Sequence, residues 1–219
     1  MIRKPILLTM IAFSLPLLFC GPVRAAQHTG PYVGVFLGGN IVPDSSASDD
    51  LGTFTLSFNP ALQGNVAAGW DLKQDSPLGT GRIELEYARR SNPLDQVEFV
   101  EGKATGDGDL TVDSLLINFI GVLRNETRWS PYVLIGIGAA RIDASDLRVT
   151  GQPLSTDTAT TFAYQVGGGV DYALTDSLSL DLGYRFFSTP PPKFTEANGN
   201  KFTADYASHS IILGLRVGF

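Results

Sequence analysis

The segment LSLDLGYRFF, residues 178–187, shows most clearly how this chain folds. Its side chains alternate in character along the chain: Leu178, Leu180, Leu182, Tyr184 and Phe186 occupy one set of positions, and Ser179, Asp181, Gly183, Arg185 and Phe187 occupy the other. Successive side chains of a β-strand point to opposite faces. This period of two therefore predicts a strand with one apolar face and one face that is mostly polar or small.

The same alternation recurs in seven further segments. It is clear in 62–71, 82–88, 162–172 and 210–219, and less clean in 32–41, 111–123 and 131–143. The connections alternate in length, because 42–57, 92–110, 144–159 and 188–203 are long whereas 72–80, 124–130 and 174–177 are short. The sequence thus predicts an all-β, up-and-down meander with long loops at one end and short turns at the other.

Composition bears on what surrounds this sheet. Charged residues make up 17% of the chain and apolar residues 43%, while its 24 glycines fall in strands as well as turns. A soluble lipocalin-like barrel or a sandwich would turn the polar face outward, and that surface would hold few charges and many glycines. A membrane barrel fits better, because lipid would cover the apolar face and only a closed barrel satisfies every strand hydrogen bond in lipid.

The N-terminus has the pattern of a secretory signal peptide. Arg3 and Lys4 precede an uncharged run, 5–19, and Val23-Arg24-Ala25 places small residues where signal peptidase reads them. We expect cleavage after Ala25, which divides the chain into a signal peptide, 1–25, and a barrel domain, 26–219. A membrane anchor and a lipoprotein modified at Cys20 are the alternatives.

Cleavage would change the charge and remove the cysteine. Lys plus Arg falls from 16 to 13 while Asp plus Glu stays at 22, so the mature net charge is 13 minus 22, or −9. Such a chain has no basic footprint for nucleic acid. It also has no disulfide and no cysteine-based metal site.

Charged residues on the polar faces are the main candidate site. They number three bases and five acids: Asp71, Arg82, Glu84, Glu86, Asp171, Asp181, Arg185 and Arg216. In a narrow barrel side chains fill the interior, and charges removed from water persist when paired. We expect a structural, salt-bridged lumen, and the alternative is a small-solute channel.

Aromatic residues gather near the expected short turns. They are Trp70, Trp129, Tyr132, Tyr172 and Phe219. Amphipathic rings favour the membrane interface, so we expect this group to mark one membrane boundary.

The last strand carries a family resemblance. The ending IILGLRVGF (211–219), with YVG at 32–34, PYV at 131–133 and GGGVDY at 167–172, resembles small OmpA-like and opacity-type surface proteins. The resemblance implies an eight-stranded antiparallel transmembrane barrel in the outer membrane of a Gram-negative bacterium, in contact with its lipid and lipopolysaccharide. It also implies insertion by the barrel-assembly machinery, which would read Leu215, Val217 and Phe219. The match covers the barrel alone, so peptidoglycan anchoring is not implied.

Catalytic residues are sparse. The histidines are His28 and His209, and the pair His209-Ser210 is similar to the His and Ser of barrel lipid A deacylases. Adjacent strand residues point to opposite faces, so these two cannot form a dyad. We expect no enzyme, no cofactor and no metal site; the Gly-Asp-Gly-Asp run at 106–109 lacks a full calcium loop.

The long loops remain as the place for function. Loops 42–57 and 92–110 are acidic, and Leu51, Phe54, Leu56 and Phe58 either extend the first hairpin above the membrane or contact a partner. The prediction is a non-enzymatic outer-membrane barrel whose loops serve envelope integrity or adhesion. The alternatives are a small-solute channel and, further off, a lipid A deacylase.

Overall fold

The computed structural model describes residues 29–48, 53–72, 80–99, 102–144, 146–153, 157–195 and 201–219. The predicted signal peptide lies outside the described residues, as do Cys20 and His28. Within the described residues, no helix is long and apolar enough to cross a membrane.

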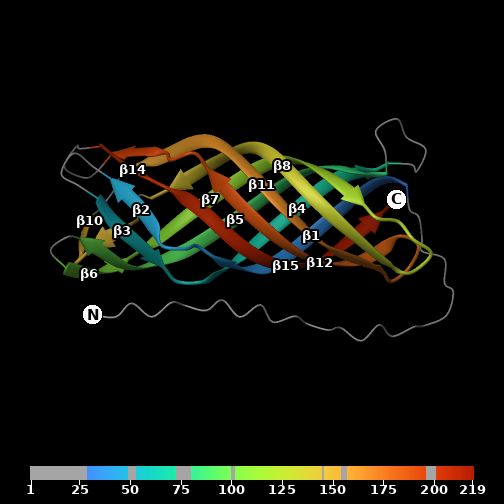
Figure 1. Ribbon diagram of the computed structural model, residues 1–219, viewed down its shortest axis with the longest axis horizontal. Coiled ribbons are helices and arrows are strands. Elements are labelled where there is room, and N and C mark those ends of the chain that lie inside the picture. Colours follow the sequence, from blue (N-terminus) through green and yellow to red (C-terminus); the bar gives the residue numbers. More distant parts are fainter. Residues whose placement is uncertain are drawn as a thin grey trace, which may run out of the picture.

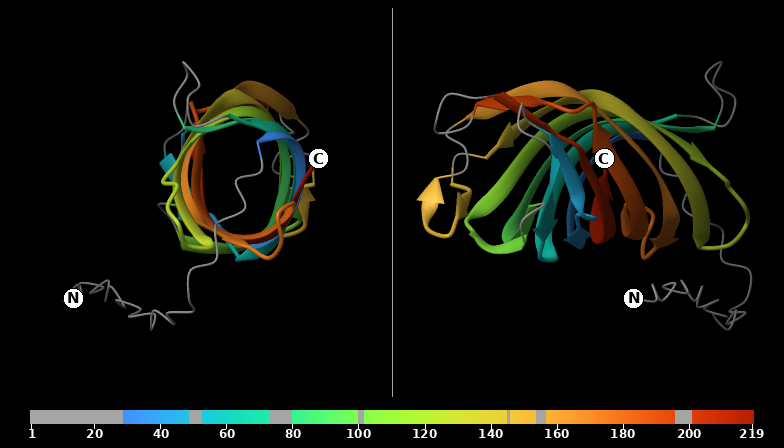
Figure 2. Two further views of the ribbon diagram at one scale, coloured as in Figure 1. Left: turned by 90° about the vertical axis from the view of Figure 1, so that its right-hand side faces the viewer. Right: turned by 60° about the vertical axis from the view of Figure 1, so that its left-hand side comes forward.

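Eight long strands form a closed antiparallel ring (Figures 1 and 2). Each strand pairs with the next along the chain, and the last pairs with the first over the register Tyr32↔Gly218 to Ile41↔His209. The ring strands correspond to the eight predicted segments. They are β1 (Gly30–Ile41), β4 (Ala61–Asp71), β5 (Gly81–Phe99), β7 (Asp109–Val122), β8 (Trp129–Asp143), β11 (Thr158–Ala173), β12 (Leu178–Thr189) and β15 (Tyr206–Gly218).

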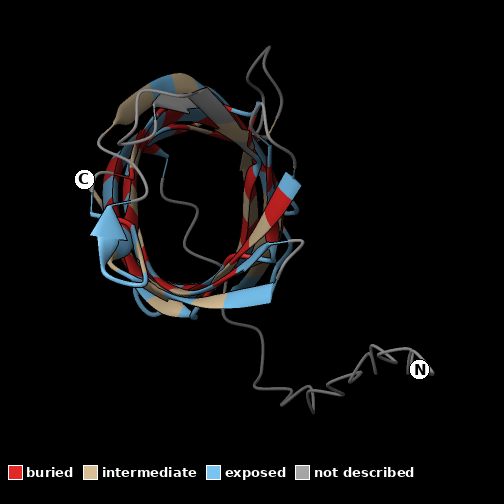
Figure 3. Cartoon of the chain, turned by 90° about the vertical axis from the view of Figure 1, so that its left-hand side faces the viewer, coloured by how far each residue is buried: buried red, intermediate tan, exposed pale blue. Residues whose placement is uncertain are grey.

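Side chains alternate between the inside and the outside of the ring, as the period of two predicts. In β12, Asp181 and Arg185 are buried whereas Leu182 and Tyr184 are exposed. Buried and exposed residues alternate in the same way along the other ring strands (Figure 3). The apolar faces therefore form the outer surface and the polar faces point inward.

The long connections carry further strands, which lie at one end of the ring (left in Figure 1). We call these strands, with the part of β5 that pairs with them, the extension. They are β2 (Ser45–Ser48), β3 (Thr53–Phe58), β6 (Gly102–Asp107), β9 (Arg148–Val149), β10 (Gln152–Pro153), β13 (Lys193–Thr195) and β14 (Lys201–Ala204). The 19-residue β5 runs out of the ring and pairs with both β3 and β6.

The prediction that 42–57 and 92–110 are mainly loop is wrong. Most described residues in both ranges are strand, and β5 continues to Phe99. Thr53, Phe54, Thr55 and Phe58 of β3 are residue types that suit a pleated surface once a partner edge is present. The long β5 supplies that edge.

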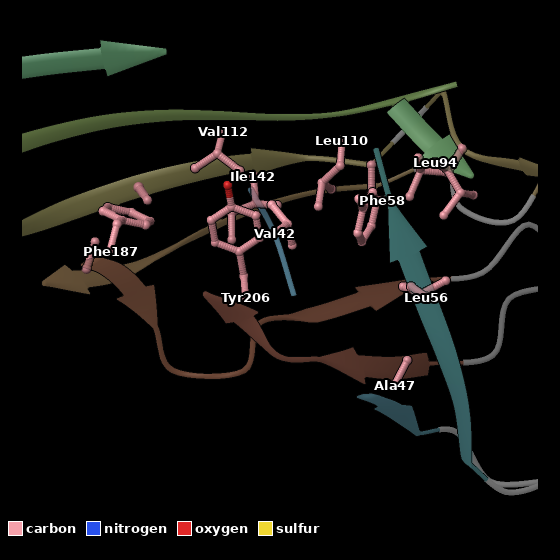
Figure 4. Close-up of a cluster of buried hydrophobic side chains, with 14 of the residues drawn as sticks. Val42, Ala47, Leu56, Phe58, Leu94, Leu110, Val112, Ile142, Phe187 and Tyr206 are labelled. Atoms are coloured by element: carbon pink, nitrogen blue, oxygen red, sulfur yellow. The ribbon is translucent and has the colours of Figure 1, made fainter. Parts of the chain in front are cut away.

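An apolar cluster fills the inside of the ring at the extended end (Figure 4). Phe54, Leu56 and Phe58 of β3 are part of it, so they extend the hairpin and point inward. The rest comes from the ring strands and their connections, and includes Leu94, Val97, Leu110, Val112, Leu116, Ile142, Leu147, Phe187 and Tyr206. This apolar cluster lies at the extended end, and the polar residues described next occupy the rest of the interior.

Candidate functional site

The predicted charged residues line the ring interior. Arg216 is partly exposed and the other seven are buried. The structure adds Arg90 and Arg124, which sequence reasoning missed. Among the described residues the interior thus holds five arginines (82, 90, 124, 185, 216) and five carboxylates (71, 84, 86, 171, 181), so its formal charge is balanced.

Asp171 is the centre of the ion pairs. Its Oδ2 accepts from Arg82 Nη1 at 2.6 Å and from Arg216 Nη2 at 2.9 Å. Asp71 forms a further ion pair with Arg124, which belongs to the short turn after β7. The side chains of all five residues are at most 11% exposed. Buried pairs of this kind fix side-chain positions, because leaving one partner alone would be costly.

A second set of interior hydrogen bonds involves Asp181, the register partner of Asp171. Tyr132 donates to Asp181 Oδ1 at 3.0 Å, and Arg185 Nη1 donates to the Tyr132 hydroxyl at 3.2 Å. The prediction that Tyr132 is an interface aromatic is wrong, because the residue is buried inside the ring. Nearness to a short turn suggested the interface, whereas the parity it shares with buried Leu134 places it inward.

Neutral side chains donate hydrogen bonds to the two interior glutamates. Glu84 accepts from the Tyr32 hydroxyl at 2.9 Å and from Asn118 Nδ2 at 3.0 Å. Gln165 Nε2 donates to Glu86 Oε1 at 3.0 Å. Neutral donors therefore supplement the arginines around these carboxylates.

Arg90 lies against the apolar cluster. Its Nη1 donates to Ser114 at 2.9 Å, and its guanidinium carbon is 4.2 Å from the centre of the Phe187 ring. No carboxylate of the described residues is within ion-pair distance of Arg90. Arg90 could have been found from the sequence, because it is an even number of residues from Arg82, Glu84 and Glu86 and so lies on the same face of the strand. The strand continues past its predicted end at residue 88.

Two cavities reflect the two halves of the interior. One lies at the short-turn end beside Asp71, Arg82, Asp171 and Arg216 and is partly open to solvent. The other lies in the apolar cluster and is lined by residues that include Leu56, Phe58 and Tyr206. The interior is therefore charged at one end and apolar at the other.

The remaining predicted residues lie on the outside. Trp70, Trp129 and Phe219 are exposed, and the Trp129 and Tyr172 rings are 4.6 Å apart. Leu215 and Val217 also face outward. The Phe219 amide donates to the Pro31 carbonyl, which fixes the last residue to the first strand. The interface and assembly roles of these residues stay predictions.

His209 and Ser210 point to opposite faces, as strand geometry requires. Ser210 is buried and donates to Asn40 Oδ1 at 2.9 Å and Gln63 Oε1 at 2.7 Å. On the outer face His209 Nδ1 is 2.7 Å from the Tyr184 hydroxyl. In the part of the chain that the structure describes, no group of three His, Cys, Asp or Glu side chains could hold a metal ion.

An antiparallel ring with an apolar exterior and a paired, charged interior defines the class of outer-membrane β-barrels, because such a ring leaves no strand edge unpaired in lipid. Comparison with known families agrees. Residues 8–219 match the family described as "Outer membrane protein beta-barrel domain", and the chain belongs to this family. It is a protein of the bacterial outer membrane.

Individual relatives are distant. The chain is 25% identical over 175 residues to the outer membrane protein PagN of Salmonella typhimurium, covering 71% of this chain and 72% of PagN. The solved structure of OprG from Pseudomonas aeruginosa is similar with a TM-score of 0.61 at 15% identity, over 90% of this chain and 100% of OprG. Neisserial surface protein A gives 0.53 at 20% identity, over 87% of this chain and 98% of that protein. Both structures support the fold alone.

Proposed function

We propose that the ring is an eight-stranded transmembrane barrel without enzymatic activity, whose extension stands on the cell surface and contacts other molecules. The short turns would then face the periplasm. The observation that carries this proposal is the apolar cluster, which occupies the interior at the extended end and packs against β3 of the extension from inside. With paired charges at one end of the interior and packed apolar side chains at the other, the outer surface of the extension is the part exposed to other molecules.

The interior gives catalysis little support. Ser210 donates to amide oxygens, and His209 lies on the other side of the strand. The lipid A deacylase alternative therefore lacks a histidine beside a serine at the one position that suggested it.

A small-solute channel is the second candidate, and specific atoms favour it. Glu86 Oε2, Arg90 Nη2 and Ser208 Oγ are buried and have no hydrogen-bond partner among the described residues. Buried polar groups of this kind commonly bind water. A conducting path would still require the apolar cluster to open.

Single-channel recording of the refolded protein in a planar bilayer separates the two candidates. We expect no discrete conductance from the folded wild-type barrel, and none from Arg185→Ala. Phe187→Ala removes a fully buried ring of the apolar cluster. If any variant conducts ions, we expect this one to do so. Discrete steps in the wild type that change with Arg185→Ala would instead establish the channel.

The surface role has a separate test at the tip of β5. Phe99 is exposed there, and its ring is 5.7 Å from that of Phe54. Exposed aromatic residues are common binding anchors. We expect Phe99→Ser to lower attachment of protein-bearing cells to a cell monolayer severalfold, with Gln96→Ser, an exposed neighbour, as control. If cells bearing the wild-type protein attach no better than cells lacking the protein, the adhesion role is contradicted.

A further inference from the structure

A group of charged residues on the outside of the ring lies at the edge of the apolar surface nearest the extension. Arg89 of β5, Asp113 of β7 and Arg141 of β8 are register neighbours on adjacent strands, and all three face outward. Toward the short-turn end the next outward residues on these strands are apolar or aromatic: Tyr87, Leu85, Leu115, Ile117, Ala139 and Ile137. Charges on a lipid-facing strand are costly at mid-membrane and tolerated at the interface, so the group belongs at headgroup level.

The two arginines are not neutralised to the same extent. Asp113 accepts from the Tyr87 hydroxyl at 2.6 Å and lies 3.5 Å from Arg89 Nη1, whose side chain is 61% exposed. Arg141 is exposed, and no carboxylate of the described residues forms an ion pair with it. The three residues together carry a net charge of +1, and Asp143, two residues beyond Arg141 on the same face of β8, adds a carboxylate beside them. Among the described residues no ion pair neutralises the Arg141 guanidinium, which can therefore bind an anion.

The outer surface of the ring beside Arg141 is shaped to accommodate an acyl chain. The next outward residue of β8 is Ala139, whose register partners are Leu115 on one side and Phe162 on the other. Both neighbours are 51% exposed and larger than alanine. A hydrocarbon chain can lie over Ala139 between these side chains, one outward position from Arg141 toward the short-turn end.

We propose that Arg141 and Arg89 bind the phosphate of an acylated, phosphorylated glycolipid of the outer leaflet, the lipid portion of lipopolysaccharide. Guanidinium groups bind phosphate through paired hydrogen bonds, and the apolar strip below provides for the acyl chains. This inference rests on the proposed topology, because only the outward-facing leaflet supplies that lipid at the extended end.

Native mass spectrometry of the refolded protein with added lipid tests the site. We expect Arg141→Ala to weaken binding of diphosphoryl lipid A about tenfold, the scale of one charge-assisted hydrogen bond. Arg141→Lys should retain part of the affinity. Arg148→Ala, which removes an exposed arginine of β9, should leave affinity unchanged. Lipid A stripped of phosphate should bind the wild type at least as weakly as diphosphoryl lipid A binds Arg141→Ala, because it also loses the contact with Arg89.

Several results would overturn the proposal. A folded Arg141→Ala barrel could bind diphosphoryl lipid A as tightly as the wild type does, or the wild type could bind dephosphorylated lipid A equally well. Phosphatidylglycerol could also bind as tightly as lipid A and depend on Arg141 to the same extent, or inorganic phosphate at an equal concentration could displace lipid A. The last would assign the site to free phosphate.

Topology is tested separately by labelling intact cells with an impermeant maleimide. Ser46→Cys in the extension should label and Glu126→Cys at the short-turn end should not. The reverse pattern would refute the proposed topology itself. Labelling of Ser46→Cys with a failed lipid test would refute the lipid site alone.

Discussion

Removing Arg82 tests whether the interior ion pairs hold the barrel together. Arg82 pairs with Asp171 at 2.6 Å, its guanidinium carbon is 5.3 Å from the Tyr132 ring centre, and its side chain is 2% exposed. Truncating one partner of a buried ion pair costs about 3–5 kcal/mol. Arg216 still pairs with Asp171 at 2.9 Å, so the lower end of that range applies.

The measurement is the free energy of unfolding in urea, followed by the fluorescence of Trp70 and Trp129. Arg82→Met should lower it by about 3 kcal/mol, and Asp171→Asn by about 5 kcal/mol, because the second change leaves two arginines without their carboxylate. The double variant should lose less than the sum, with a coupling free energy of about 2 kcal/mol.

An exposed pair provides the control. Lys103 and Glu98 lie 3.4 Å apart in the extension with side chains 62% and 56% exposed. Replacing either by alanine should cost less than about 1 kcal/mol. Additive losses for Arg82 and Asp171, or losses no larger than those of the control pair, would refute the view that paired charges stabilise the interior.

Three further changes probe packing and chemistry. Phe187→Ala should lower the free energy of unfolding in urea by about 3–5 kcal/mol, because it removes a fully buried ring from the apolar cluster. Gly214→Val should abolish the folded form on a heat-modifiability gel, since a Cβ there would overlap the Phe36 ring, and Phe36→Ala in the same chain should partly restore it. His209→Ala and Ser210→Ala should leave lipid A acylation unchanged by mass spectrometry; a changed acyl pattern would revive the deacylase alternative.

The ring strands could be predicted because their faces differ in chemistry. In 178–187 and 82–88 polar and apolar residues alternate, so the inward set follows from parity alone. The segments 111–123 and 131–143 were less clean for a physical reason: β7 and β8 bury Leu116, Ile120 and Leu134 inside while also facing apolar residues outward. Where both faces of a strand are apolar, hydrophobic alternation does not show which face points inward.

The extension and part of the candidate site could not be predicted for a different reason. β2 is a four-residue segment of small residues, and β3, whose Phe54, Leu56 and Phe58 alternate with Thr and Ser, has only six residues; both become strands by pairing with other segments. Arg124 lies in a turn, where alternation gives no direction, yet it reaches Asp71 inside the ring. Such contacts depend on how the ring closes, which local pattern does not determine.

Closure of the ring between β1 and β15 constrains the order of folding. The strand near the start of the described chain finds its partner only when the last one is present, so this pairing spans almost the whole chain. Until then a partly inserted sheet would have two unpaired edges, each costly in lipid and able to pair with a neighbouring chain. Insertion and closure should therefore be a single slow event with high contact order, and a chain truncated before β15 should not accumulate as a stable partial barrel.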